Sequence, residues 1–206
     1  DFTQSERDTL LPGLQVLKGQ YDTLRTVALD NNVPVPLYFD PRLPGQTLPT
    51  GDDTYLFQEF PTKRPENIEE CAFYTIGQLA HLIRTRQVTS LELTTMYLER
   101  LKRHGPTLEC VVTITEELAL KQARRADKNI KAGRYLGPLH GIPYGAKDLL
   151  AVPGYKTTWG AMTHKDQVLD ETATVVQKLE DAGAVLVAKL TLGALAWGDV
   201  WYGGKT

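Results

Sequence analysis

DETATVVQKLEDAGAVLVAKL, residues 170–190, decides the fold class, because it places a helical pattern directly before a fully apolar segment. The helical pattern covers 170–183 and closes at Gly183, a residue type that commonly follows a helix C-terminus. AVLVAKL (184–190) has the length and composition of a buried strand. A helix that leads straight into a buried strand is typical of α/β proteins, in which at least some strands run parallel.

The region before this stretch repeats the alternation. Thr75 and Thr89 each begin a predicted helix with a capping-box pattern. Gly105-Pro106 predicts the end of the second helix, and LECVVTI (108–114) predicts a buried strand. An alanine-rich helix follows and ends at Gly133, while TLGALAWG after residue 190 favours a short helix. The predicted fold is therefore α/β, with helices packed on a mixed β-sheet.

Residues 1–68 differ from the rest and predict an N-terminal helical and extended arm, followed by a domain that occupies 69–206. Leucines recur every three or four residues after Ser5, which predicts a helix that Pro12-Gly13 should kink or split. The proline-rich segment 33–53 predicts an extended arm. Its apolar residues favour wrapping on a neighbouring surface, and a plain linker is the alternative.

Composition excludes several functional classes. The 206 residues are 42% apolar and 23% charged with a net charge of -2, so no basic surface for nucleic acid is indicated. The four histidines and two cysteines form no metal-binding pattern, although a single Cys71–Cys110 disulfide stays open. No stretch of about eighteen apolar residues is present, so we expect no membrane span.

The chain begins at Asp1 without methionine, which we interpret as processing or trimming. A cytoplasmic protein and an exported protein that has lost a signal peptide both fit this start. The compartment therefore stays open, and so does the oligomeric state, with a homodimer compatible with the sequence.

GPLHGIPYGAKD, residues 137–148, carries Lys147 at the end of a nearly apolar run. Burial disfavours the charged form of a lysine, and a neutral amine can take a proton from a serine hydroxyl. From the residues alone the alternative is an ordinary ion pair, in which Asp148 keeps Lys147 charged. We interpret His140 as a structural hydrogen-bonding residue.

The same block resembles the hallmark of the amidase signature family, GPLxGIPxxxKD. The resemblance continues in TSLELTTMYLERLKRH (89–104) and in VVTITEELALKQARRADKNIKAG (111–133), which lie before the block. Downstream, Thr157-Thr158-Trp159-Gly160 is similar to the family's TT-x-G turn, and ATVVQKLEDAGAVLVAKLTLGALA (173–196) is similar to its helix and strand. The likeness covers about residues 73 to 206.

This resemblance implies an amide hydrolase with a Ser–cis-Ser–Lys triad, no cofactor, no metal and a small-molecule amide substrate. Carried over, the lysine of the triad is Lys147, and the turn near the substrate contributes Gly160, Ala161 and Met162. The family's serines lie in a Gly/Ser-rich motif, whereas no serine follows Ser90 here. We therefore expect this chain to supply the lysine only, to need the remainder of the same polypeptide, and to be inactive alone.

Two departures bear on the substrate. Thr191 and Ala194 stand where the family has asparagine and glutamate. The alternatives to an amidase are a glutaminase subunit of a tRNA-dependent amidotransferase and a non-catalytic binding protein with the same fold.

Overall fold

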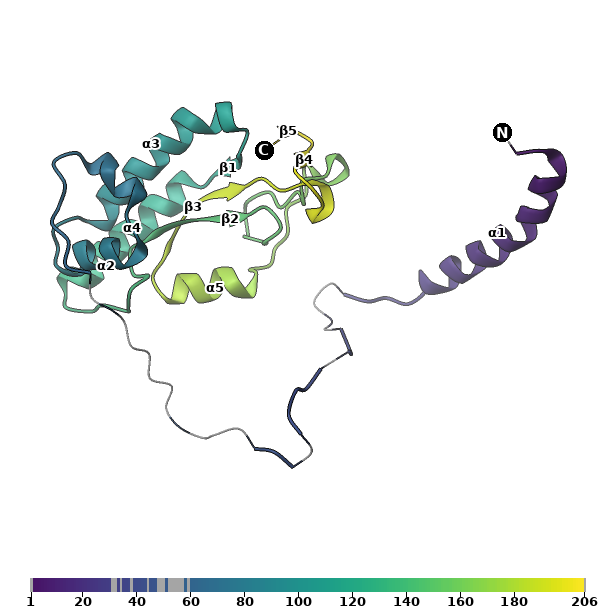
Figure 1. Cartoon of the computed structure of the whole chain (residues 1–206), viewed down its shortest axis with the longest axis horizontal. Helices are drawn as coiled ribbons and strands as arrows, with labels where there is room; N and C mark the ends of the chain where they lie inside the picture. The colour runs from purple at the N-terminus through teal and green to yellow at the C-terminus, as the bar shows by residue number, and fades with distance from the viewer. Residues whose placement is uncertain are drawn as a thin grey trace. The chain divides into compact units, whose positions relative to one another are not determined.

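The computed structural model describes residues 2–30, 33, 35–37, 39–43, 45–47, 51, 58 and 60–205. The chain divides into two compact units, Asp1–Thr54 and Tyr55–Thr206, which are described separately (Figure 1).

The first unit contains α1 (Gln4–Leu24), which begins with a capping box between Thr3 and Glu6. The helix runs unbroken past Pro12, so the predicted split there is absent. The predicted extended arm 33–53 falls partly on residues outside those described (34, 38, 44, 48–50, 52–53), and its wrapping stays a prediction.

The second unit begins its regular structure with η1 (Ile68–Phe73), α2 (Ile76–Arg84) and α3 (Ser90–Leu108). The capping boxes predicted at Thr75 and Thr89 are confirmed. Arg64 already belongs to this unit, since its guanidinium lies 2.7 Å from the Glu92 carboxylate. The predicted domain division between residues 68 and 69 stays a prediction.

Helix α3 does not stop at Gly105-Pro106, so that prediction is wrong. It continues to Leu108 and ends at Glu109, which has a left-handed backbone (φ 49°). Gly105 is buried with its Cα facing Val111, where an added Cβ would meet that side chain at 3.2 Å. This close approach to the next strand favours continuation of the helix over a turn. Strand β1 (Val111–Ile114) is accordingly shorter than predicted.

The remaining main elements are α4 (Glu116–Lys131), β2 (Pro143–Lys147), α5 (Thr174–Asp181) and β3 (Val185–Leu190). The three-stranded sheet has the order β1-β3-β2, with β1 antiparallel and β2 parallel to β3. The predicted α/β fold with a mixed sheet is confirmed. Residues 143–147, for which the sequence predicted no strand, pair with β3.

Helices cover both faces of the sheet (Figure 1). On one face Val185 and Val187 of β3 pack against α3 and α4. On the other face Leu186 packs with Ala146 of β2 and Val176 of α5. Burial on both faces explains why β3 is apolar along most of its length.

The C-terminal part contains η2 (Met162–His164), η3 (Ala194–Ala196), β4 (Val200–Trp201) and β5 (Gly204–Lys205). The short helix predicted after residue 190 is only a distorted 3-10 turn, in which Leu195 has a φ of 55°. The hairpin of β4 and β5 is tied back by Lys205, whose backbone N–H donates to Glu109 Oε2 at 2.8 Å.

Three other expectations concern single features. Cys71 and Cys110 are both free, so the disulfide is not formed. Within the part of the chain that the structure describes, no helix is long and apolar enough to cross a membrane. In that same part, no group of three or more His, Cys, Asp or Glu side chains gathers as a metal site would require.

Candidate active site

Lys147 is the last residue of β2 and pairs in register with Leu190 of β3. Its side chain is exposed, and no hydrogen bond or ion pair to its amine is found among the described residues. In this chain the amine is therefore hydrated. A lysine that accepts a proton needs to be buried. For Lys147 this burial stays a prediction, and it requires further chain to cover the end of β2.

Asp148 does not pair with Lys147. Successive side chains of an extended segment point to opposite faces, and the two residues follow this rule. The Asp148 carboxylate is fully buried, and its Oδ1 lies 2.8 Å from Nζ of Lys189, which is also fully buried. The carboxylate is thus used inside the unit, and the ordinary Asp148–Lys147 ion pair is ruled out as the structural role of these residues.

Lys189 is the residue that sequence reasoning missed. It is the charged member of the otherwise apolar β3, and a lone charge in such a strand is the signal that could have found it. A register shift between Tyr144 and Gly145 of β2 lets β3 accommodate an extra residue. Lys189 consequently pairs with Ala146 and shares the face of Asp148.

The turn Thr157–Gly160 is held against the strand ends by Asp148. The Thr158 N–H donates to Asp148 Oδ2 at 2.9 Å, and the Thr158 hydroxyl donates to the same oxygen. The Trp159 N–H donates to the Asp148 carbonyl at 3.2 Å. This places the turn directly beside the residue that comes after Lys147.

The predicted substrate-binding residues begin in this turn. Gly160 has a φ of 66°, and a Cβ there would lie 2.3 Å from the Leu192 carbonyl oxygen, so only glycine fits. Ala161 is buried, whereas Met162 is 59% exposed at the start of η2. Met162 alone of the three offers a free side chain, and substrate binding by these residues stays a prediction.

Ser90 is the serine of the second unit, and the sequence contains one other, Ser5. Its hydroxyl is fully buried and donates to the Gly141 carbonyl at 2.8 Å. This hydrogen bond joins the start of α3 to the chain that leads into β2, at the end of the strand away from Lys147. Ser90 therefore has a structural role.

The structural interpretation of His140 is confirmed. The ring is almost fully buried, and its Nδ1 accepts a hydrogen bond from the Leu136 N–H at 3.0 Å. Burial is the main cause that lowers the pKa of His140 below its usual 6.5, and the charge of Arg125 acts in the same direction. The folded protein thus favours the neutral imidazole.

We expect the unfolding free energy to decrease as the pH falls below about 6.5. Between 6.5 and the lower pKa of the folded state, the unfolded His140 binds more protons, so acid favours unfolding. His140→Asn keeps an acceptor near Nδ1 and removes the titration. Denaturant unfolding at pH 5.5 and 7.5 should show a smaller pH effect in this variant. The exposed His104→Asn should behave like the wild type, and an unchanged pH effect in His140→Asn would contradict the prediction.

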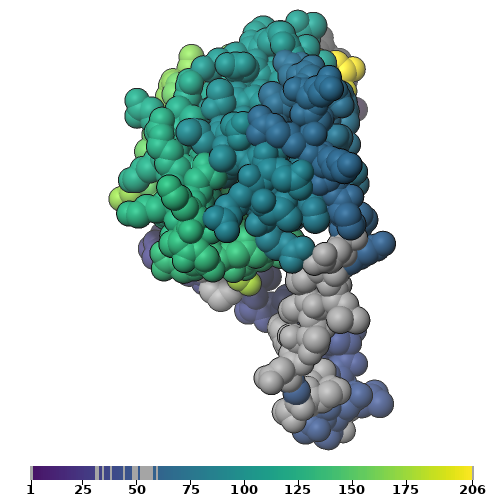
Figure 2. Space-filling view, turned by 90° about the vertical axis from the view of Figure 1, so that its left-hand side faces the viewer, coloured from purple at the N-terminus to yellow at the C-terminus, as the bar shows by residue number. Residues whose placement is uncertain are grey.

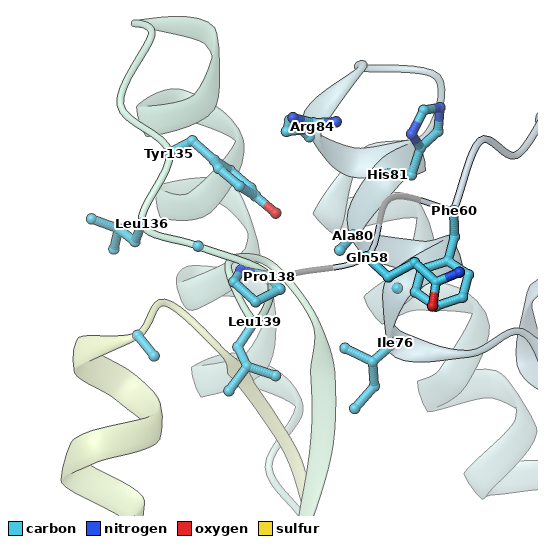
Figure 3. Close-up of a pocket in the computed structure, with 13 residues that line it drawn as sticks. Gln58, Phe60, Ile76, Ala80, His81, Arg84, Tyr135, Leu136, Pro138 and Leu139 are labelled. Atoms are coloured by element: carbon cyan, nitrogen blue, oxygen red, sulfur yellow. The ribbon is translucent and has the colours of Figure 1, made fainter. Parts of the chain in front are cut away.

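A groove of about 740 Å³ lies on another part of the second unit. Figure 2 shows a face of the second unit on which the first residues of that unit, coloured blue, lie. The groove is lined by α2 residues such as Ile76, His81 and Arg84 and by the segment 135–139, where Tyr135 and Leu139 are drawn (Figure 3). These residues lie before β2, near the strand's N-terminal end. Ligand sites of parallel strands lie at their carboxyl ends, so the groove is separate from the Lys147 region.

Comparison with known proteins identifies the class. Residues 92–199 match the family described as Amidase, and this match spans more than half of the chain. The chain therefore belongs to the amidase family, as the sequence motifs indicated.

Individual relatives agree with this assignment. The chain is 42% identical over 125 residues to a glutamyl-tRNA(Gln) amidotransferase subunit from Azoarcus sp. (strain BH72), covering 61% of this chain and 26% of that protein. It is 40% identical over 130 residues to the putative amidase AmiD of Mycobacterium tuberculosis, covering 62% and 27%. The peptide amidase of Stenotrophomonas maltophilia superposes with a TM-score of 0.56 at 33% identity, covering 61% and 26%. The chain thus spans about a quarter of the length of these relatives.

Proposed function

We propose that this chain forms the lysine-bearing part of an enzyme that hydrolyses carbon–nitrogen bonds in amides. The observation that carries the proposal is the position of Lys147. It ends strand β2 inside the segment that matches the amidase family, and its amine is free of partners among the described residues.

The proposed chemistry assigns one role to this chain. Lys147 accepts a proton that is relayed from a nucleophilic serine through a second serine. The nucleophile attacks the amide carbonyl, the amine or ammonia leaves, and water then releases the acid from the acyl-enzyme. The chain contains two serines, Ser5 and Ser90, and the Ser90 hydroxyl donates a hydrogen bond to the Gly141 carbonyl. Both triad serines are therefore proposed to lie in further chain. Residues 1–206 alone are expected to be inactive.

Burial of Lys147 is a consequence of the same proposal. Chain that carries the serines has to cover the carboxyl end of β2 to bring a hydroxyl within hydrogen-bond reach of the amine. The turn 157–160 is hydrogen-bonded to Asp148 next to this strand end, so we propose that a substrate amide bound beside this turn would lie close to the nucleophile.

A second function is supported by a specific observation, since relatives of this chain include a glutamyl-tRNA(Gln) amidotransferase subunit. In that case the same lysine would serve a glutaminase that acts together with partner subunits. A binding protein that has lost the serines remains the non-enzymatic alternative.

One assay separates the three functions. A protein that carries residues 1–206 together with the serine-bearing region is incubated with small primary amides, peptide amides and glutamine, and released ammonia is measured. We expect hydrolysis of small amides without any partner. If glutamine is the one substrate that yields ammonia, and if it does so only after partner subunits are added, the protein is a glutaminase and not an amidase. Binding of amides without turnover would leave the non-catalytic protein.

A further inference from the structure

Next to Lys147 lies a closed polar cluster, formed by Asp148, Thr157, Thr158 and Lys189. All four side chains have an exposed fraction of 0%. Buried polar side chains are rare unless they are paired, so a group of four at one place requires an explanation. The proton relay proposed above uses none of them.

The four side chains are closed to solvent, so burial keeps them away from a substrate. An ammonium has three N–H donors. Lys189 donates hydrogen bonds to the Lys156 carbonyl at 2.8 Å and to Thr157 Oγ1 at 3.1 Å, and its Nζ forms an ion pair with Asp148 Oδ1 at 2.8 Å. The other carboxylate oxygen, Asp148 Oδ2, accepts from both the N–H and the hydroxyl of Thr158. The cluster therefore touches no reacting atom and acts through its neighbours.

Its neighbours include the peptide group that joins Lys147 to Asp148. The Asp148 N–H donates to the Leu190 carbonyl at 2.7 Å, which extends the β2–β3 ladder one residue beyond the strand. The Lys147 carbonyl accepts from the Leu150 N–H at 2.9 Å. With the Asp148 side chain paired as well, the backbone on the C-terminal side of Lys147 is held by contacts on both its N–H and its C=O group.

The cluster also fixes the segment after the turn. Trp159 carries a left-handed backbone with a φ of 51°. Its carbonyl accepts from the Leu195 N–H at 2.7 Å, and the Gly160 carbonyl accepts from the Tyr202 N–H at 3.1 Å. Through the turn 157–160, the Asp148–Lys189 pair is thus connected to the backbone of Leu195 and Tyr202.

We propose that Asp148, Lys189 and Thr158 are positioning residues, which hold the Lys147 amine and the turn 157–160 in the arrangement that amide hydrolysis requires. This inference rests on the proposed function, in which Lys147 is the base. The inference predicts that loss of a positioning residue lowers kcat and leaves KM nearly unchanged, because a displaced base slows the chemical step while substrate binding is kept.

Thr158→Val tests the proposal, since valine keeps the shape of threonine and removes the hydroxyl that donates to Asp148. In the serine-containing protein we expect kcat to fall about 10- to 100-fold, the range that a displacement near 1 Å can cause. KM should change less than about threefold. Thr158→Ser restores the hydroxyl and should recover most of kcat. Thr95→Val, at an exposed position of α3, is the matched control and should leave both constants unchanged.

The outcomes distinguish the inference from the function on which it rests. A wild-type kcat in Thr158→Val, together with an inactive Lys147→Ala, overturns the positioning role and keeps the base. Full activity of Lys147→Ala overturns the proposed function itself. If Thr158→Val does not fold, the charge-free double variant Asp148→Asn/Lys189→Met answers the same question: a reduced kcat at unchanged KM supports the positioning role, and an unchanged kcat overturns it.

Discussion

Replacing Lys147 with alanine is expected to lower kcat for amide hydrolysis by about 10²- to 10⁴-fold or more, the usual contribution of a positioned acid–base group. The second unit should keep its fold, because the Lys147 side chain is exposed there and has no hydrogen bond or ion pair among the described residues. Steady-state hydrolysis of a primary amide measures the rate, and circular dichroism with a thermal melt measures the fold.

Lys147→Arg sharpens this experiment. Arginine keeps the positive charge and a similar length, but a guanidinium does not release its proton at working pH. We therefore expect Lys147→Arg to be as inactive as the alanine variant. Lys165→Ala removes another exposed lysine of the same unit and should keep the wild-type rate. Full turnover by either Lys147 variant, or a wild-type rate that stays constant from pH 6 to 9, would contradict a base at this position.

The sequence predicts the elements whose signals are local. The capping boxes at Thr75 and Thr89 depend on residues three apart, and both helices begin where they predict. The apolar run of β3 identifies a strand buried on two faces, and Lys147 is found by its motif. These features need no knowledge of distant contacts.

Strand β2 could not be predicted in this way. Pro143 and Gly145 both disfavour a strand, and they make GIPYGAK look like a loop. Pro143 is tolerated as the first residue, where a missing N–H costs least. Gly145 packs closely on β3, because a Cβ there would lie 2.5 Å from the Leu190 side chain, which would have to move. The strand exists because of its partner, which is tertiary information.

The orientation of Lys189 depends on a single irregularity of pairing. Strict alternation from Leu186 would put Lys189 on the face of α3 and α4, away from Asp148. The register shift after Tyr144 brings it to the face of Leu186 and Ala146 instead. Sequence periodicity carries no information about such a shift, so the candidate site was predicted without the ion pair beside it.

Lys189→Met is expected to destabilise the protein by about 3–5 kcal/mol, because it leaves the buried Asp148 carboxylate without its ammonium. Methionine fills a similar volume, so the loss reports on charge and not on a cavity. The carboxylate keeps Thr158 as a donor, but this does not compensate a full buried charge. Denaturant unfolding should show the decrease in unfolding free energy directly.

The double variant Asp148→Asn/Lys189→Met decides whether the charge is the cause. With both charges gone, no group is left ionised and unpaired, and we expect most of the lost stability to return. The exposed pair of Lys102 and Glu116, with an N–O distance of 2.7 Å, is the matched control. Because water screens an exposed pair, Lys102→Met should cost at most about 1 kcal/mol. If Lys189→Met is as stable as Lys102→Met, the prediction is contradicted. The hydrogen bonds from Thr158 would then be enough to stabilise the buried Asp148 carboxylate.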